Sequence, residues 1–141
     1  MNSRLALADA GRLIGKLVDR TREGKIAWTV TTRRSGHNAL EAALEGGMKV
    51  IVWLANREVG FTVALGVDEA QQEVEAREAE LPETDLLAIT LGDPARHNYD
   101  FPEEEEIYKG LVELHELARR SAYRVDARFE EINNYLDRIA G

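Results

Sequence analysis

Cysteine is absent from the 141-residue chain, which excludes disulfides, thiolate metal sites and cysteine nucleophiles. Long apolar runs are absent as well, since the longest, residues 50–55, is far too short to cross a bilayer. Charged residues are spread through the first twenty positions, so this part of the chain offers no uncharged signal core. Together these absences predict a cytoplasmic protein, in keeping with a reducing compartment.

An excess of basic charge is also missing. The formal net charge is −8, which argues against general nucleic-acid binding because that binding depends on neutralising phosphates. The charge is segregated along the chain: residues 1–34 hold eight basic and three acidic residues, whereas residues 68–85 hold eight acidic residues and one base. Segregated charge of this kind is typical of a docking surface.

What the chain does contain is the composition of a folded domain. With 44% hydrophobic and 31% charged residues, we expect residues 1–141 to form a single domain with a core of its own. The apolar spacing of residues 3–23 predicts a helix, ended by Gly24 in a left-handed cap. Alternating apolar residues predict strands at 25–32 and 59–67, and continuous apolar runs predict strands at 48–55 and 85–91.

Two segments leave alternatives open. Residues 38–45 carry a capping box of Asn38 and Glu41, but Leu40, Ala42 and Leu44 also alternate before a Gly-Gly turn. Because this stretch is short for a helix, we predict a strand there. Residues 68–81 have helix-forming composition with a thin apolar stripe, and they could equally be a charged edge strand.

Two helices are predicted at the C-terminal end. One runs from Phe101 to about Ala122, and the second starts at Asp126 and should bury Phe129, Ile132, Leu136 and Ile139. The predicted fold class is therefore α+β, with an N-terminal helix, an antiparallel meander of four to five strands, and two C-terminal helices. We expect these helices to pack on one sheet face, because their apolar stripes must be buried.

Two sequence segments resemble parts of a group of small, mostly uncharacterised bacterial proteins. The segments are "LVDRTREGKIAW" at 17–28 and "LVELHELARRSAYRVDARFEEINNYL" at 111–136. Together they cover about a third of the chain, and their motifs are packing motifs. The resemblance implies an α+β fold with a strand at 73–79, and it implies no activity. The alanine-rich stretch 38–45 departs from the pattern of that group.

The stretch "DPARHNYDFPEEEE" gathers a histidine and several carboxylates. Asp100 can cap a helix, with Glu103 three residues later completing a capping box, and the glutamates at 103–106 suit the positive end of the helix. A metal or catalytic site at His97 and Asp100 is the alternative. Since every feature has a structural role, we interpret this cluster as the start of a helix.

Other motifs lack a residue that their chemistry requires. "HELAR" at 115–119 has Arg119 where a zinc protease needs its second histidine, and Glu116 can instead pair with Arg120. "GRLIGKL" at 11–17 has the wrong spacing for a phosphate loop. Gly11 and Gly15 more plausibly allow a neighbouring element to approach closely. We expect no cofactor and no stoichiometric zinc or iron.

Three functional hypotheses follow. The favoured one is a non-enzymatic protein-interaction module, an adaptor or regulatory subunit of a bacterial system that has a protein partner and no membrane contact. A second is an anionic-ligand binder or enzyme, and a third is nucleic-acid contact through the first helix, which we do not favour. A homo-oligomer is left open. The residues assigned to docking are Glu73, Glu75, Glu78 and Glu80; those assigned to an anion are Arg33, Arg34 and His37; the basic stripe is Arg12, Lys16 and Arg20.

Overall fold

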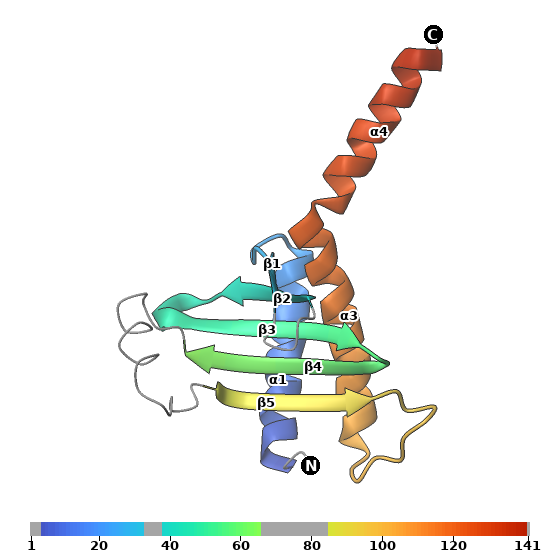
Figure 1. Ribbon diagram of the computed structural model, residues 1–141. Coiled ribbons are helices and arrows are strands. Elements are labelled where there is room, and N and C mark those ends of the chain that lie inside the picture. The colour runs from blue at the N-terminus through green and yellow to red at the C-terminus, as the bar shows by residue number, and fades with distance from the viewer. Residues whose placement is uncertain (1–3, 33–37, 66–84, 141) are drawn as a thin grey trace.

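A computed structural model describes residues 4–32, 38–65 and 85–140 (Figure 1). Five strands form one antiparallel sheet in which each strand pairs with the next along the chain. The predicted α+β fold is confirmed. Its elements are α1 (Arg4–Arg22), β1 (Thr29–Thr32), β2 (Asn38–Ala43), η1 (Glu45–Gly47), β3 (Met48–Ala55), β4 (Glu58–Leu65), β5 (Asp85–Gly92), α3 (Glu103–Tyr123) and α4 (Val125–Ala140).

Strand β2 settles the ambiguity at residues 38–45 in favour of the predicted strand. Leu40 and Ala42 point to the same face and are buried, as the alternation requires. The turn that follows uses Gly46 and Gly47, whose φ angles of 75° and 73° lie where residues with a β-carbon are disfavoured. The helix-capping interpretation of Asn38 and Glu41 is therefore wrong.

Strands β3 and β4 form the central hairpin of the sheet. Asn56 and Arg57 both have positive φ, so the two residues between Ala55 and Glu58 make a tight hairpin turn whose twist matches the strands. On one face of this hairpin, Val50, Val52, Val59 and Phe61 are fully buried. On the opposite face the indole of Trp53 lies over Gly60, its partner across the strand pair.

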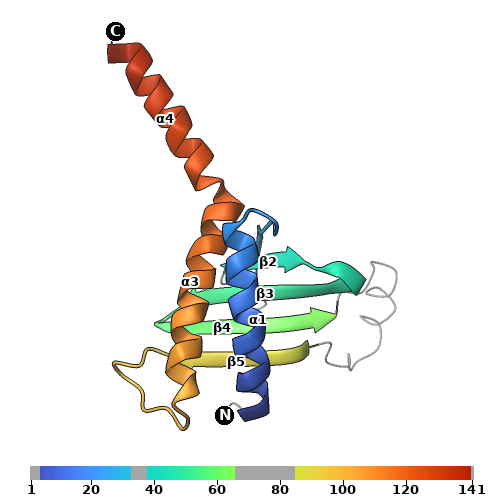
Figure 2. The same ribbon diagram turned by 180° about the vertical axis from the view of Figure 1, so that it is seen from behind.

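Helices α1 and α3 lie side by side on one face of the sheet (Figure 2). Leu7 and Ala10 of α1 and Leu111 and Leu114 of α3 are buried against the strands. Helix α1 ends at Arg22, and Gly24, whose φ is 76°, forms the predicted left-handed cap. The Gly24 N–H donates to Thr21 O at 3.0 Å, and the Lys25 N–H donates to Arg20 O at 2.9 Å. These two helices bury the apolar face of the sheet.

Two residues predicted on buried strand faces are more exposed than expected. The strand predicted from residue 25 begins at Thr29, and Val30 is 41% exposed because β1 is an edge strand of the sheet. Leu65 is 43% exposed because it is the last residue of β4.

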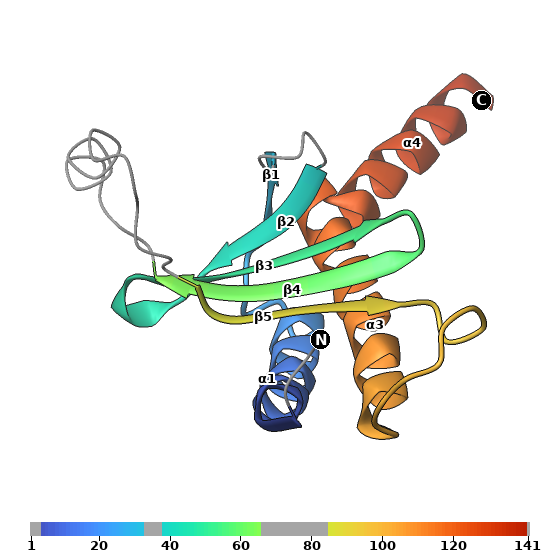
Figure 3. The ribbon, with the colours of Figure 1, turned by 60° about the horizontal axis from the view of Figure 1, so that its bottom comes forward.

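The largest departure from expectation concerns α4. This helix projects away from the sheet and from the other helices (Figures 1 and 3). None of its described residues is buried, so the prediction that both C-terminal helices pack on the sheet is wrong for α4. The second helix on the sheet face is α1. No helix in the described ranges is long and apolar enough to cross a membrane.

Candidate interaction surface

Several predicted residues fall outside the part of the chain that the structure describes. The strand at 73–79 implied by the resemblance and the open choice for residues 68–81 lie there. So do the two clusters assigned to docking and to anion binding. These are Glu73, Glu75, Glu78 and Glu80, and Arg33, Arg34 and His37.

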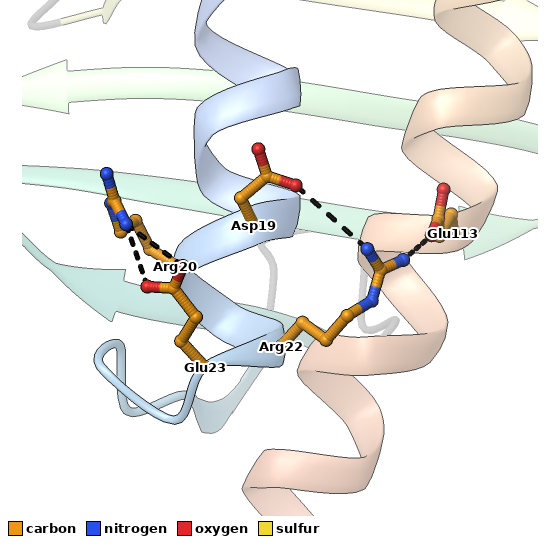
Figure 4. Close-up of polar contacts among 5 residues, drawn as sticks. All are labelled: Asp19, Arg20, Arg22, Glu23 and Glu113. Carbon is orange, nitrogen blue, oxygen red and sulfur yellow. Dashed lines mark hydrogen bonds and ion pairs between the residues drawn. The ribbon is translucent and has the colours of Figure 1, made fainter.

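The basic stripe of α1 is largely neutralised by carboxylates of its own neighbourhood. Arg12 pairs with Asp9 at 2.6 Å, and Arg20 pairs with Glu23 at 2.7 Å (Figure 4). The hydrogen bond from Arg20 holds the pKa of Glu23 below its usual value. Lys16 is the one residue of this stripe with no carboxylate partner among the described residues. A phosphate would have to compete with these carboxylates, which argues against the nucleic-acid hypothesis.

Ion pairs also tie α1 to α3 at two places. Arg22 reaches across to Glu113 and lies 4.0 Å from Asp19 (Figure 4). At the other end, Arg4 pairs with Glu103 at 2.7 Å, and its guanidinium carbon lies 5.2 Å from the centre of the Phe101 ring. The basic residues at the two ends of α1 thus hold its position against α3.

The carboxylate cluster at residues 103–106 is the start of α3, as predicted, but the predicted capping box of Asp100 and Glu103 is wrong, because the N-cap is Pro102 and it makes no side-chain cap bond. Helix α3 begins at Glu103, and the Phe101 N–H donates to the Glu104 carboxylate at 3.0 Å. Glu104, rather than Glu103, is therefore the carboxylate that reaches back, and it is buried. Glu103 is used in the ion pair with Arg4.

The loop before α3 gives its histidine and tyrosine structural contacts. The ring of His97 lies against Gly92, where an added β-carbon would come within 2.3 Å of it. The Tyr99 hydroxyl donates to the carbonyl of Gly92, and burial raises the pKa of Tyr99 to about 12. The loop therefore folds on the end of β5.

The "HELAR" segment forms ion pairs on the surface of α3. Glu116 pairs with Arg119 at 2.8 Å and with Arg120 at 3.8 Å, the second being the pair predicted from the spacing. His115 is half-buried, and this loss of water lowers its pKa. Within the described ranges no three His, Asp or Glu side chains gather as a metal ion would need.

Helix α4 presents a continuous apolar stripe to solvent. We call it the α4 stripe; its residues are Phe129, Ile132, Tyr135, Leu136 and Ile139, which are 49–62% exposed. Four of them repeat at alternating intervals of three and four residues, the spacing of a helix that packs against another helix. A helix with one apolar side normally buries it. This one is unpartnered in the described chain.

The junction before α4 is built from specific contacts. Arg124 adopts a left-handed backbone, with φ 53° and ψ 47°, and its N–H donates to the carbonyls of Arg120 and Ser121. The side chain of Arg120 pairs with Asp126 at 2.7 Å, and Arg128 Nε donates to the Tyr123 carbonyl at 2.7 Å. Because contacts cross the junction from both sides, α4 is held in a defined direction.

A groove of about 390 Å³ runs between α1 and α3. We call it the α1–α3 groove. Ile14, Val18 and Ile107 contribute apolar surface, three glycines contribute none, and Arg22 with its carboxylate partners lies at one end. The residues that line it are Gly11, Ile14, Gly15, Val18, Asp19, Arg22, Glu106, Ile107, Gly110 and Glu113.

The glycines of this groove differ in what surrounds them. A β-carbon at Gly110 would lie 3.1 Å from Ile14 Cγ2, so Gly110 lets the two helices come close. A β-carbon at Gly11 would be 3.9 Å from Ile107, an ordinary contact, and one at Gly15 would meet no described atom within 4 Å. The sequence predicts that Gly11 and Gly15 allow a neighbouring element to approach closely. At Gly15 no such neighbour is present in the described chain.

A second hollow, of about 550 Å³, lies between residues 25–29 and 41–45. Two of its charged side chains are already paired, Lys25 with Glu23 and Glu41 with Lys49. These pairs occupy two of the charged groups that a polar ligand would use in this hollow.

Comparisons of this chain with protein-family models, with curated proteins and with solved structures find no match. The sequence identified the apolar residues of α4, but it assigned them to the core. The assignment failed because a single residue, Arg124, separates α3 from α4, and the apolar pattern does not show that so short a connection keeps α4 from folding back.

Proposed function

We propose that this chain is a non-enzymatic protein-interaction module, an adaptor or regulatory subunit of a bacterial system, which binds its partner through the α4 stripe. One observation carries the proposal. A helix held in a fixed direction exposes five large apolar side chains, and no described segment covers them.

The energy available to such a contact is substantial. Full burial of a large apolar side chain contributes roughly 1.5–3 kcal/mol, so each half-exposed residue of the α4 stripe retains about 1 kcal/mol. In the free protein this surface stays in contact with water. A partner that covered it would gain that free energy, less the cost of association.

The spacing of the stripe indicates the kind of partner. Apolar residues at alternating intervals of three and four residues match a helical surface with the same repeat, which receives them in holes between its own side chains. The partner surface is therefore helical and apolar. We also propose a cytoplasmic location, which the cysteine-free composition supports.

The alternatives have less support. The anion-binding alternative is assigned to Arg33, Arg34 and His37, which lie outside the described residues, and the described His97 packs on Gly92. Two of the three basic residues offered for nucleic acid are paired with carboxylates.

The test is co-purification with matched variants. Leu136→Glu places a carboxylate in the α4 stripe, and Asn134→Glu places the same charge on the opposite side of the helix. We expect tagged wild-type and Asn134→Glu proteins to recover the same partner in near-equal amounts from cells that express them. Leu136→Glu should recover at least about tenfold less, since a carboxylate in an apolar contact is costly.

Equal recovery by all three proteins, in quantitative mass spectrometry, would show that α4 is not the contact surface. Circular dichroism of Leu136→Glu controls for loss of the fold.

A further inference from the structure

We infer that the α4 stripe binds a second copy of this chain, and that α4 of each copy lies in the α1–α3 groove of the other. This inference depends on the proposed function and names the partner of the same surface. The exposed α4 stripe of one copy would then be buried against the apolar lining of the groove on the other copy.

Within the part of the chain that the structure describes, α4 cannot reach the α1–α3 groove of its own copy. Two antiparallel helices joined as a hairpin need a loop of two to five residues, and only Arg124 separates α3 from α4. The backbone bonds of Arg124 and the pair between Arg120 and Asp126 further fix the direction of α4. The groove on the same copy is therefore out of reach unless several residues unwind.

The groove has features that a third helix requires. Ile14, Val18 and Ile107 give it an apolar lining, and Gly11 and Gly15 remove side chains along α1 where another backbone would approach. A glycine within a helix is unfavourable, and at Gly15 no described neighbour accounts for it. A helix from another molecule, at the interaxial distance of packed helices, would account for it.

The charges around the two surfaces are compatible. The groove rim carries Asp19, Glu106 and Glu113 against one base, Arg22. At 3.6 residues per turn, the four acidic residues of α4 point about 100° or more away from the centre of its stripe, whereas Arg128 flanks it. The α4 stripe can therefore pack in a groove with an acidic rim without placing an acidic residue of α4 next to the carboxylates of that rim.

The reciprocal arrangement also uses more surface than direct pairing of two α4 helices. With about 100 Å² exposed on each of the five stripe residues, covering the stripes of both copies would remove roughly 1,000 Å² of α4 surface from water, and the surface of the two grooves adds to this total. A single α4–α4 contact would bury the two stripes alone, without any groove surface. It would also leave the glycines of α1 without a role.

The experiment measures the oligomeric state of the purified full chain by sedimentation across a concentration series. Gly15→Leu fills the groove at a position where a β-carbon would meet no described atom within 4 Å, and Leu136→Glu places a charge in the stripe. We expect a wild-type dimer whose dissociation constant rises at least about tenfold in either variant. Asn134→Glu should dimerise as wild type does.

Mixing the two variants distinguishes the groove contact from other dimers. Gly15→Leu keeps an intact α4, and Leu136→Glu keeps an intact groove, so their mixture should form a heterodimer with one working contact. A dimer that Gly15→Leu leaves unchanged would overturn the groove and indicate α4–α4 pairing. A wild-type monomer at all concentrations would overturn self-association, while co-purification of another protein that depends on Leu136 would still support the proposed function.

Discussion

At the scale of single residues, glycines with similar sequence contexts have opposite environments. Gly110 is required because Ile14 of the neighbouring helix lies against it, whereas a β-carbon at Gly15 would meet no atom of the described residues within 4 Å. The cost of a helical glycine is the same in both places, roughly 0.5–1 kcal/mol relative to alanine. Within the described residues of one copy, only the cost at Gly110 is offset, by the close packing of the two helices that this glycine allows.

We therefore predict opposite effects of alanine at these positions. Gly15→Ala should raise the free energy of unfolding by about 0.5–1 kcal/mol, from helix propensity alone. Gly110→Ala should lower it by about 1–2 kcal/mol, because the new methyl group presses on buried Ile14. Urea unfolding of both variants on a Leu136→Glu background checks this without contributions from association. Destabilisation by Gly15→Ala would mean that another part of the chain occupies that space.

His115 gives a second prediction at this scale. Burial lowers its pKa below the ordinary value of 6.5, so the unfolded chain binds a proton that the folded chain does not. Stability should therefore fall as the pH is lowered through about 6.5, until the folded protein is protonated too. His115→Gln should remove this part of the pH dependence between pH 7 and 5. The measurement is the urea midpoint of both proteins across that range, and parallel curves would contradict the assignment.

At the scale of elements, the β3–β4 hairpin is fixed by more than its alternating pattern. The turn at Asn56 and Arg57 sets the register, and Trp53 packs on the bare backbone of Gly60 opposite it. A β-carbon at Gly60 would lie 1.8–2.2 Å from three ring atoms of Trp53. This strand pair thus has a large residue on one strand that needs the smallest residue on the other.

Gly60→Ala should consequently destabilise the protein by about 2–3 kcal/mol, since the indole must move or the strands must separate. Gly92→Ala is the matched control, because the His97 ring that it would meet is exposed and can turn away. In a double-mutant cycle with Trp53→Ala, the Gly60→Ala penalty should largely disappear. Additive effects would show that Gly60 is required for a reason other than Trp53.

At the scale of the whole molecule, the body of α1, α3 and the sheet is separate in its energetics from α4. The body contains every buried side chain of the described core, and α4 contributes none. Its apolar stripe therefore does little for the stability of one copy. It remains available for association.

This separation gives a prediction about stability. Leu111→Ala, within the core, should lower the free energy of unfolding by about 2–5 kcal/mol. Leu136→Glu should change it by no more than about 0.5 kcal/mol at low protein concentration, as substitutions on open surfaces do. Wild-type unfolding at rising concentration is the control, because association would stabilise the wild type alone. A large loss in Leu136→Glu at low concentration would indicate that α4 packs on its own body.

Much of this architecture follows from the sequence. The period of the apolar residues determined the helix from Arg4, the strands of the meander and the α3 core residues such as Leu111 and Leu114, because each pattern reports which face of an element avoids water. The cap at Gly24 was readable because glycine suits a left-handed residue after a helix, and the helix predicted from Phe101 begins two residues later, at Glu103. The four residues of the α4 stripe spaced by three and four were equally readable as apolar.

What only the tertiary structure decided is where those apolar faces go. An apolar stripe on a helix does not show whether another part of the same chain can pack against it. Here one residue with a left-handed backbone, Arg124, directs α4 away from the sheet. The groove depends likewise on two helices that are almost a hundred residues apart in sequence, brought together so that Ile14 meets Gly110. Local patterns determine which surfaces are apolar, because they depend on neighbours along the chain. Which surfaces remain open depends on connections and packing that no short stretch of sequence contains.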